Sequence, residues 1–415
     1  MFGEYVQRNL WPHNLDMKVD PRSSNDEDFL PQSILLRSYQ EEAVRKAIEA
    51  KKSTIKSATG TGKTIIAIAW LEQLAKDALV IVPTQALIYQ AWTPKLIEYG
   101  FRDIGQYYAY AKKFGPVTLT TFASAIAHPD LLDSVEAVVV DEIHHLGAYQ
   151  ALNKLLPKLK GKEYVLGLSS VPEREDKSHE LFLKEFPIIF DLSLGSALRK
   201  GYVAEIEVYN VPAPMSSEER AQYEMLTARI QKAFRFCGPN IIRWNRCFDP
   251  KTRTYVGRQG IWAMARRKKV LSDIESKKEA VLKIVNEHSQ EPIILFAESV
   301  AAIENIRTFL LSKEISCETF HSGTDHLKRM ELLKNWGEEF QVLLSCRALE
   351  EGMDVKEVSV GILITSGKSR RQFIQRIGRV IRPLEGKVAR FYVVYCKDTV
   401  EETYSNTIAK LLQSP

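Results

Sequence analysis

Residues 57–64, with the sequence SATGTGKT, have the types and spacing of a loop that binds nucleotide phosphates. Glycines in such a loop let backbone N–H groups close around an anion. Lys63 would reach the β- and γ-phosphates, and Thr64 would offer its hydroxyl to Mg²⁺. The strict pattern begins with glycine, where this chain has Ser57, and the alternative interpretation is a Gly/Thr turn before a surface helix. The residues expected to bind the nucleotide here are Ser57, Ala58, Thr59, Gly60, Thr61, Gly62, Lys63 and Thr64.

A second chemical signal is the pair of adjacent carboxylates, Asp141 and Glu142, that follows the apolar segment 138–140. Asp141 would hold Mg²⁺, and Glu142 would position and deprotonate the attacking water. Burying two carboxylates without a cation would be costly, so a purely structural role is disfavoured.

Three weaker signals flank these two. Arg37 and Gln40 precede the loop, and a glutamine amide can pair with the edge of adenine while Tyr39 stacks on it, although the start of an amphipathic helix explains the same residues. Thr84 and Thr121 lie at expected strand exits, where threonine can bind a phosphate backbone or simply cap a turn.

The surrounding elements predict how these residues are held. A strand over 53–56 and a helix over 64–74 would place the phosphate at a helix N-terminus. Apolar segments predict further strands at 78–83, 117–119, 138–140 and 164–168. Their alternation with helices predicts a doubly wound parallel α/β domain that binds ligands at the carboxyl ends of its strands.

The length and composition limit the number of domains and the class of protein. A length of 415 residues predicts two or three domains, and 45% hydrophobic with 26% charged residues is typical of a soluble globular protein. The net charge of +5 permits nucleic acid as a partner. The five cysteines lack the spacing of a zinc site and indicate reduced thiols, and neither a signal peptide nor a membrane span is expected. A cytoplasmic location, or a nuclear one in a eukaryote, is therefore predicted.

The α/β rhythm stops between residues 202 and 270. A helix is expected over 217–234, and basic and aromatic residues then alternate with Asp249 as the only acid up to residue 269. They are Arg235, Phe236, Arg243, Trp244, Arg246, Phe248, Lys251, Arg253, Tyr255, Arg258, Trp262, Arg266, Arg267, Lys268 and Lys269. Such a surface suits base stacking and phosphate contact, but a solvated charged face on a small helical insert is an equal alternative.

A second α/β rhythm follows without a second phosphate loop. Strands are expected at 292–296, 316–320, 341–345, 358–364 and 390–395. Gln375, Arg379 and Arg382 would share one face of a helix. Such a face is usually solvated or faces DNA, but opposite a phosphate loop in another domain it can supply arginines to the γ-phosphate.

The ordered segments LRSYQ, SATGTGKT, VIVPTQAL, TTFASA, VVVDEIHH and GLSSVPERED resemble the motifs of superfamily 2 helicases. DEIH resembles the DExH form of the second motif, and the Arg-Glu-Asp sequence at 174–176 resembles the XPB and UvsW-like DNA-repair branch. One departure is Ser-Ser-Val at 169–171, where that branch more often has a Thr-Ala-Thr type of sequence. The second half resembles the C-terminal domain of the same superfamily.

The resemblance implies two RecA-like doubly wound parallel-sheet domains in tandem, with a small, mainly helical basic insertion that acts as a DNA-gripping thumb. The expected divisions are a polar extension over 1–31, domain 1 over 32–203, the insertion over 204–270 and domain 2 over 271–415. ATP and Mg²⁺ are the implied cofactors. The implied catalytic residues are Lys63, Asp141, Glu142, Gln375, Arg379 and Arg382, with Arg37, Gln40, Gly352 and Asp354 also binding the nucleotide. The implied nucleic-acid contacts are Thr84, Thr121, Arg174, His321 and Ser345.

The implied activity is ATP-driven movement on DNA, 3′ to 5′, as a helicase in repair, recombination or replication. Its partner would be single-stranded, forked or branched DNA, together with a nuclease or repair protein. The alternatives are a double-stranded DNA translocase that does not separate strands, an ATP-gated motor subunit of a nuclease or restriction complex, and an RNA helicase. The Arg-Glu-Asp sequence disfavours the RNA helicase, and the presence of Glu142 disfavours a motor that does not hydrolyse ATP.

Overall fold

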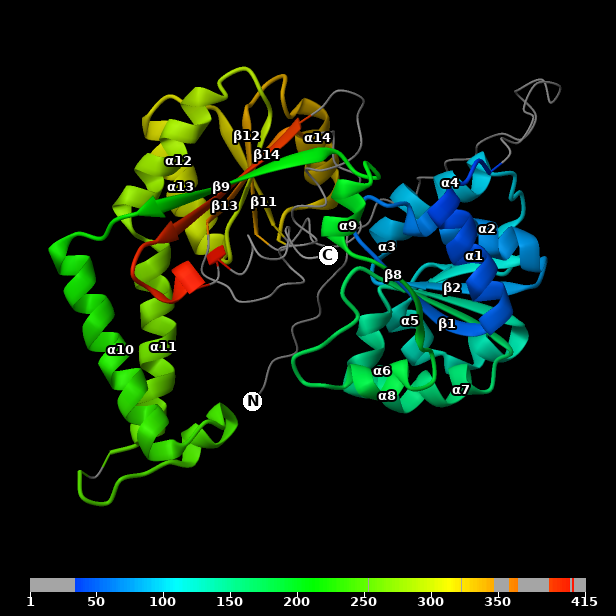
Figure 1. Ribbon diagram of the computed structural model, residues 1–415, viewed down its shortest axis with the longest axis horizontal. Helices are drawn as coiled ribbons and strands as arrows, with labels where there is room; N and C mark the ends of the chain where they lie inside the picture. The colour runs from blue at the N-terminus through cyan, green and yellow to red at the C-terminus, as the bar shows by residue number, and fades with distance from the viewer. Residues whose placement is uncertain are drawn as a thin grey trace, which may run out of the picture.

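The computed structural model describes residues 34–346 apart from 253 and 322, residues 358–364, and residues 388–406 apart from 404. Within these ranges the chain forms two separate sheets, each with helices on both faces (Figure 1). The predicted fold class of two parallel-sheet α/β domains is confirmed.

The first domain holds an eight-stranded sheet of the described residues, in the order β4-β3-β5-β2-β6-β7-β1-β8. Only the β3–β4 pair is antiparallel among its pairings. Its strands are β1 (Lys52–Ser57), β2 (Ala78–Val82), β3 (Ile104–Tyr108), β4 (Ala111–Lys113), β5 (Val117–Thr121), β6 (Ala137–Asp141), β7 (Tyr164–Ser169) and β8 (Ile188–Leu192). Its helical elements are α1 (Ser38–Ala50), α2 (Lys63–Leu74), α3 (Gln85–Leu87), η1 (Ile88–Trp92), α4 (Thr93–Glu98), α5 (Phe122–Ala127), η2 (Pro129–Ser134), η3 (Ile143–Gly147), α6 (Tyr149–Lys154), α7 (Leu156–Lys160), α8 (His179–Leu183) and α9 (Leu194–Arg199).

The central strand β2 is apolar and buried at every position because both faces of the sheet are covered. On β2, Val80 and Val82 pack into the core beneath α1 and α2, while Leu79 and Ile81 pack into the opposite core with α5, α6 and α7. Each fully buried aliphatic side chain contributes about 1.5–3 kcal/mol of transfer free energy. This two-sided burial holds the carboxyl ends of β1, β2, β6 and β7 in fixed register.

The second domain holds a six-stranded parallel sheet of the described residues, in the order β11-β12-β10-β13-β14-β9. Its strands are β9 (Glu205–Ala213), β10 (Ile293–Phe296), β11 (Cys317–His321), β12 (Val342–Cys346), β13 (Val360–Ile364) and β14 (Val388–Cys396). Its helices are α12 (Glu275–Glu287), α13 (Val300–Ser312) and α14 (His326–Asn335), and the hairpin between β9 and α12 contains α10 (Ser217–Cys237), η4 (Ile241–Arg246) and α11 (Val256–Ser272).

The strand β9 corrects the sequence interpretation, which placed residues 204–270 together in the insertion. Residues 205–213 instead pair with the whole of β14, from Glu205 opposite Val388 to Ala213 opposite Cys396. Glutamates alternate with apolar residues at the start of β9, as suits an edge strand, so it lacks the apolar run expected of a buried parallel strand. The strands β3, β4 and β8 were also not predicted.

The helices α10 and α11 form a hairpin that projects away from the second sheet (Figure 1). A capping box begins α10, in which Ser216 and Glu219 bond to each other's backbone N–H groups. At the far end Trp244 is buried and donates its indole N–H to Gly238 O at 2.9 Å. A Cβ at Gly260 would lie 2.3 Å from that of Ala233, so only glycine permits this close approach.

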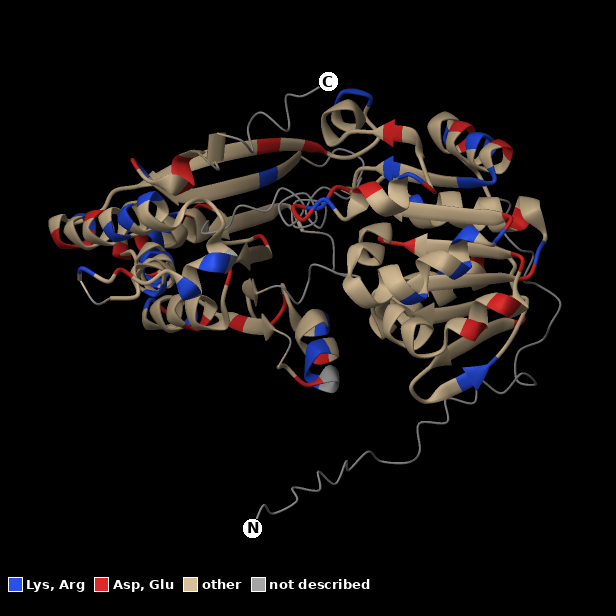
Figure 2. Cartoon of the chain, turned by 90° about the horizontal axis from the view of Figure 1, so that it is seen from below, with Lys and Arg blue, Asp and Glu red and all other residues tan. Residues whose placement is uncertain are grey.

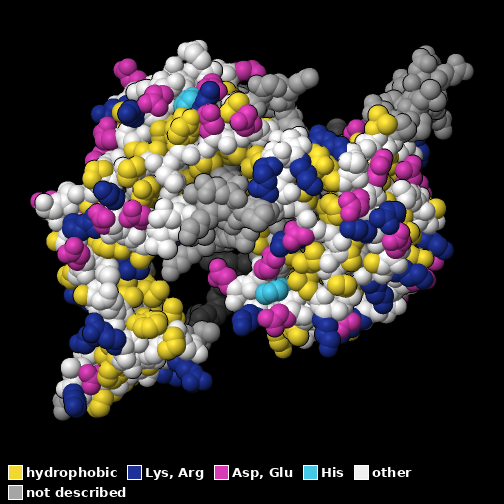
Figure 3. All heavy atoms as spheres, viewed as in Figure 1, with side chains coloured by type: hydrophobic (Ala, Val, Ile, Leu, Met, Phe, Trp, Pro, Cys, Tyr) yellow, Lys and Arg dark blue, Asp and Glu magenta, His cyan; other side chains and the backbone are white. Residues whose placement is uncertain are grey.

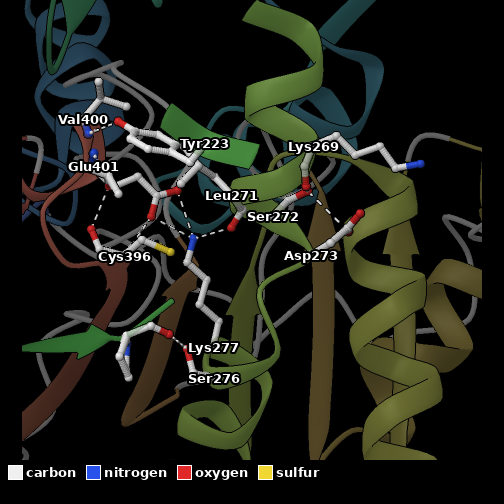
Figure 4. A network of polar contacts seen from close by, with 12 residues as sticks. Tyr223, Lys269, Leu271, Ser272, Asp273, Ser276, Lys277, Cys396, Val400 and Glu401 are labelled. Atoms are coloured by element: carbon white, nitrogen blue, oxygen red, sulfur yellow. Dashed lines mark hydrogen bonds and ion pairs between the residues drawn. The ribbon is translucent and has the colours of Figure 1, made fainter. Parts of the chain in front are cut away.

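A buried ion pair anchors the base of this hairpin (Figure 4). Lys277 of α12 and Glu401 are both almost fully buried, and Lys277 Nζ lies 2.9 Å from Glu401 Oε1 and 2.7 Å from Leu271 O at the end of α11. Glu401 Oε2 also accepts the Cys396 N–H at 2.8 Å, and the Tyr223 hydroxyl of α10 accepts the Val400 N–H at 3.1 Å. Both helices of the hairpin are therefore tied to the segment that follows β14.

We predict that Glu401→Gln lowers the free energy of unfolding by about 3 kcal/mol, because Lys277 would keep its buried charge without a carboxylate. The double variant Lys277→Met/Glu401→Leu should recover most of this loss, since it removes both charges. Melting midpoints of the purified variants measure the effect. The exposed pair Glu42–Lys46 provides the control, and Glu42→Gln should not change the melting midpoint. Melting of Glu401→Gln at the wild-type temperature would contradict the anchoring role.

Candidate nucleotide-binding and catalytic site

The predicted phosphate loop lies between β1 and α2, and its conformation depends on two glycines. Gly60 and Gly62 have φ values of 87° and 80°, in the left-handed region that glycine adopts without strain. A Cβ at Gly62 would lie 2.6 Å from Gln40 Nε2, so a side chain there would displace the Gln40 amide from the loop. Lys63 begins α2, and its Nζ donates to Ser57 O at 3.1 Å. The ammonium thus lies over the loop at a helix N-terminus, as phosphate binding requires.

The serine in the first loop position takes part in the loop's own hydrogen bonds. Ser57 Oγ lies 2.6 Å from Thr61 Oγ1, and Thr61 Oγ1 donates to Ala58 O at 2.7 Å. Both side chains are fully buried. Ser57 therefore stabilises the turn from beneath, where the strict pattern has glycine.

Two of the residues that precede the loop, Tyr39 and Gln40, contact it directly, and their predicted place at adenine stays a prediction. Gln40 Nε2 donates to Thr61 O at 3.0 Å, and Tyr39 Oη donates to the same carbonyl at 2.7 Å. The Tyr39 ring packs on Tyr202 in a tilted arrangement, with 4.2 Å between ring centroids, and Arg37 Nη1 donates to Tyr202 O at 2.7 Å. In this arrangement Tyr39 is buried against Tyr202, and Gln40 supports the phosphate loop.

The predicted carboxylate pair lies at the end of β6. Asp141 is buried, its Oδ1 accepts the Glu142 N–H and its Oδ2 accepts the Trp92 indole N–H, both at 3.0 Å. Glu142 adopts φ 50° and ψ 57°, a left-handed conformation that costs a non-glycine residue about 1 kcal/mol or more. Strain of this kind clusters at active sites, which favours a catalytic role for Glu142.

Glu142 is held by a hydrogen-bonded chain that reaches the next motif. Glu142 Oε2 accepts from Ser169 Oγ at 3.3 Å and lies 3.3 Å from His144 Nδ1. Ser169 Oγ also accepts the Val171 N–H at 3.2 Å, and Arg174 Nη1 donates to His144 O at 3.1 Å. Ser169 therefore connects the Ser-Ser-Val sequence at 169–171 to the Glu142 carboxylate, although that sequence departs from the usual Thr-Ala-Thr.

The two carboxylates have opposite electrostatic environments. Burial and the neighbouring Glu142 charge raise the pKa of Asp141 above its ordinary value, although the Trp92 bond and the Lys63 charge limit the rise. Burial also acts to raise the pKa of Glu142, but the hydrogen bond and charge of His144, with the charge of Lys63, outweigh it and hold that pKa below the ordinary value. Asp141 is a carboxylate that a cation would stabilise, whereas Glu142 stays ionised.

The chemistry of these donors fits a magnesium ion that arrives with the nucleotide. Among the described residues no group of three or more His, Cys, Asp or Glu side chains could hold a metal by itself. Mg²⁺ needs few protein ligands, since it is bound by one or two carboxylates together with substrate phosphates and water. Asp141 and the Thr64 hydroxyl at the start of α2 are of the right types.

The predicted nucleic-acid contacts have different environments. Thr84 Oγ1 and Ser345 Oγ are buried with no hydrogen-bond partner among the described residues. Thr121 caps α5 by accepting the Ser124 N–H at 3.2 Å, which is the alternative role anticipated for it. His321 ends β11 and accepts the Gly323 N–H at 3.1 Å. Arg174 is paired with Asp176 at 2.7 Å, so its guanidinium contacts protein in this conformation.

Five predicted residues lie outside the described part of the chain, and their roles stay predictions: Gln375, Arg379, Arg382, Gly352 and Asp354.

Three contributors to the site were not predicted. Trp92 and Tyr202 meet their partners across 49 and 163 residues of chain, and no local pattern indicates such contacts. His144 is the last residue of the DEIH motif, but no role was predicted for it, because its contact with Glu142 depends on the turn that η3 makes after the strand.

Two family models match the chain and divide it as the two sheets do. "Type III restriction enzyme, res subunit" matches residues 33–174, and "Helicase conserved C-terminal domain" matches residues 276–383. Among curated proteins, "DNA 3'-5' translocase XPB2" of Sulfurisphaera tokodaii is 27% identical over 90% of this chain and 84% of the relative. These two models and this relative support assignment of the chain to the XPB branch of the superfamily 2 helicases. The helicase family implies the use of ATP.

Other relatives named for XPB are longer than this chain, which spans only part of their length. "DNA 3'-5' helicase XPB" of Kineococcus radiotolerans is 23% identical over 89% of this chain and 61% of the relative. Among solved structures, the Hef helicase domain of Pyrococcus furiosus covers 90% of this chain with a TM-score of 0.61 and 17% identity, which bears on the fold alone. Within the described residues, no helix is long and apolar enough to span a membrane.

We predict that His144→Ala moves the acidic limb of the pH profile of ATP hydrolysis upward by about one pH unit or more. Without the imidazole the pKa of Glu142 rises, so the carboxylate becomes protonated earlier as the pH falls. The wild-type pKa of Glu142 lies below pH 4, so steady-state ATP turnover between pH 4 and pH 9 should show an additional loss at low pH in His144→Ala that the wild type lacks. His128→Ala is the control, because His128 packs on Tyr107. An unchanged profile for His144→Ala would show that His144 does not set the ionisation of Glu142.

Proposed function

We propose that this chain is an ATP-dependent DNA helicase or translocase that moves 3′ to 5′ and acts in DNA repair, recombination or replication. The observation that carries the proposal is the partly buried Glu142 carboxylate, held ionised by His144 and Ser169 next to the phosphate loop lysine. A switch that binds ATP without hydrolysis has no need of such a base. Relatives whose names describe DNA 3'-5' translocases and helicases support the substrate and the direction.

Each residue of the proposed site has a defined task. Residues 57–64 and Lys63 bind the phosphates, and Thr64 and Asp141 hold Mg²⁺, which neutralises phosphate charge. Glu142 orients the attacking water and accepts its proton. Arg379 and Arg382, with Gln375, would approach from the second domain and bind the γ-phosphate. Closure of the two domains on ATP and opening after hydrolysis would then move the DNA strand between them.

The proposed DNA grip has two parts. The first is at strand exits, where the buried hydroxyls of Thr84 and Ser345 would bind the phosphate backbone. The second is the projecting hairpin, which carries Lys and Arg side chains among apolar and acidic ones (Figures 2 and 3). Trp262 is 54% exposed with Arg229 beside its ring, and Tyr255 is half-exposed with Arg258 at 4.3 Å from its ring centroid. Exposed aromatic rings beside guanidinium groups suit base stacking and phosphate contact. Trp244 is not among them, because it is buried in the hairpin core.

A double-stranded DNA translocase is the second candidate, because it would use the same site. A forked duplex and a triplex distinguish the two activities: a translocase that does not separate strands displaces the third strand of the triplex and leaves the fork paired. A motor subunit for a nuclease partner and an RNA helicase are the remaining alternatives. The match to a type III restriction subunit model favours the former of these two.

The test is ATP turnover with no polymer, single-stranded DNA, duplex DNA, a fork and RNA. We predict at least tenfold stimulation by a form of DNA and loss of all turnover in Lys63→Ala and Glu142→Gln, because these variants lose the phosphate contact and the base. ATP binding should survive in Glu142→Gln. ATP turnover that is the same with every polymer would contradict the proposal. Stronger stimulation by RNA than by DNA would show that RNA is the substrate.

A further prediction concerns the hairpin. Trp262→Ala should weaken binding of single-stranded DNA by about tenfold, since stacking on one base contributes about 1–3 kcal/mol. Fluorescence anisotropy with a labelled oligonucleotide at constant salt measures it. Tyr149→Ala is the matched control, an exposed aromatic on the first domain. Equal affinities of the two variants for single-stranded DNA would show that Trp262 is not part of the DNA-binding surface.

A further inference from the structure

Trp92 has a contact that none of the family motifs accounts for. Its indole N–H donates to Asp141 Oδ2 at 3.0 Å, and its side chain is fully buried. The second oxygen of the same carboxylate accepts the Glu142 N–H. These two bonds fix both the position and the plane of the Asp141 carboxylate from the protein side.

Burial alone does not explain the choice of partner. Buried tryptophans usually find an acceptor for the indole N–H. Trp70 of α2 is equally buried, however, and its Nε1 has no hydrogen-bond partner among the described residues. This fold therefore accommodates a buried indole without an acceptor, and the pairing of Trp92 with a charged carboxylate is specific to its position. A bond to an ionised acceptor is also stronger than one to a neutral carbonyl.

The turn that carries Trp92 is unusual. α3, η1 and α4 follow one another without a break from Gln85 to Glu98, and η1, residues Ile88–Trp92, is a π-helical turn. Such turns are rare and occur mostly as single bulges at functional sites. A π turn rotates the side chains that follow it relative to an α-helix, so η1 determines which way the Trp92 ring points.

Two residues at the start of the same helical run bear on regions beyond the nucleotide site. Thr84 is the N-cap residue of α3, and its buried hydroxyl has no partner among the described residues. Gln90, within η1, donates from Nε2 to Met330 Sδ of α14 in the second domain at 3.5 Å. The run thus connects a proposed DNA contact, a contact with the second domain and Asp141.

We propose that Trp92 is a positioning residue for the metal-binding Asp141. Through Trp92, the geometry of the metal site would depend on the position of the helical run that begins after Thr84 and contains Gln90. DNA bound at Thr84, or a displacement of the second domain at Gln90, would move η1 and with it the indole that orients Asp141. This inference rests on the proposed function, because it takes Asp141 as the Mg²⁺ ligand and Thr84 as a DNA contact.

The test is metal affinity, independent of turnover. Mn²⁺ replaces Mg²⁺, and its binding to the full chain with ADP is followed by electron paramagnetic resonance. Trp92→Phe should weaken Mn²⁺ binding roughly tenfold, the usual effect of losing a partner that orients a metal ligand. Trp70→Phe, which removes the same atoms from a buried ring, should bind Mn²⁺ as the wild type does. Equal affinities in the wild type and both variants would overturn the positioning role.

A second variant separates the hydrogen bond from packing. Benzothienylalanine at position 92 exchanges the indole N–H for sulfur and keeps the size of the ring. It should reproduce the loss of Mn²⁺ affinity at an unchanged melting temperature. Wild-type Mn²⁺ affinity in this variant would show that only the shape of Trp92 matters, and would overturn the proposal.

Repeating the titration with saturating single-stranded DNA tests the coupling. DNA should change the Mn²⁺ affinity of the wild type several-fold and should leave that of Trp92→Phe unchanged. An equal change in both would overturn the coupling. If DNA fails to stimulate ATP turnover in the wild type, the proposed function fails, whereas the Mn²⁺ comparison without DNA still decides the positioning role.

Discussion

The structure depends on two adjacent carboxylates at the end of β6, of which Asp141 is buried and Glu142 is partly buried. Asp141 and Glu142 are unfavourable there unless positive groups and donors surround them. The sheet provides these groups from several elements: Lys63 from the start of α2, His144 from η3, Ser169 from the end of β7 and the Trp92 indole from η1. Parallel strands place their carboxyl ends at one edge, so this topology is what brings the groups together.

Only the elements that are encoded in short segments of the chain could be predicted from the sequence. The phosphate loop, the carboxylate pair and the central strands are encoded in short segments, because a buried parallel strand is apolar throughout and a phosphate loop needs glycines at fixed spacing. The edge strand β9 could not be predicted, because its alternating pattern gives no sign of its long pairing with β14. The contacts of Trp92 and Tyr202 also follow only from the folded chain.

The strand β9 connects the hairpin directly to the second sheet. It enters the second sheet beside β14 and leaves directly into α10, while α11 returns to α12. The hairpin is thus an extension of the second domain at the carboxyl edge of its sheet, where Ser345 also lies, and the Lys277–Glu401 pair holds its base (Figure 4). A surface that grips DNA from this position would move with the second domain as one body.

The central claim is that ATP hydrolysis at the carboxyl end of β6 drives directional movement on DNA. The most direct measurement is the release of streptavidin from biotin placed at either end of a single-stranded oligonucleotide. The account predicts ATP-dependent release from the 5′ end, little release from the 3′ end, and none in Glu142→Gln. Release that needs no hydrolysis, or equal release from both ends, would contradict it.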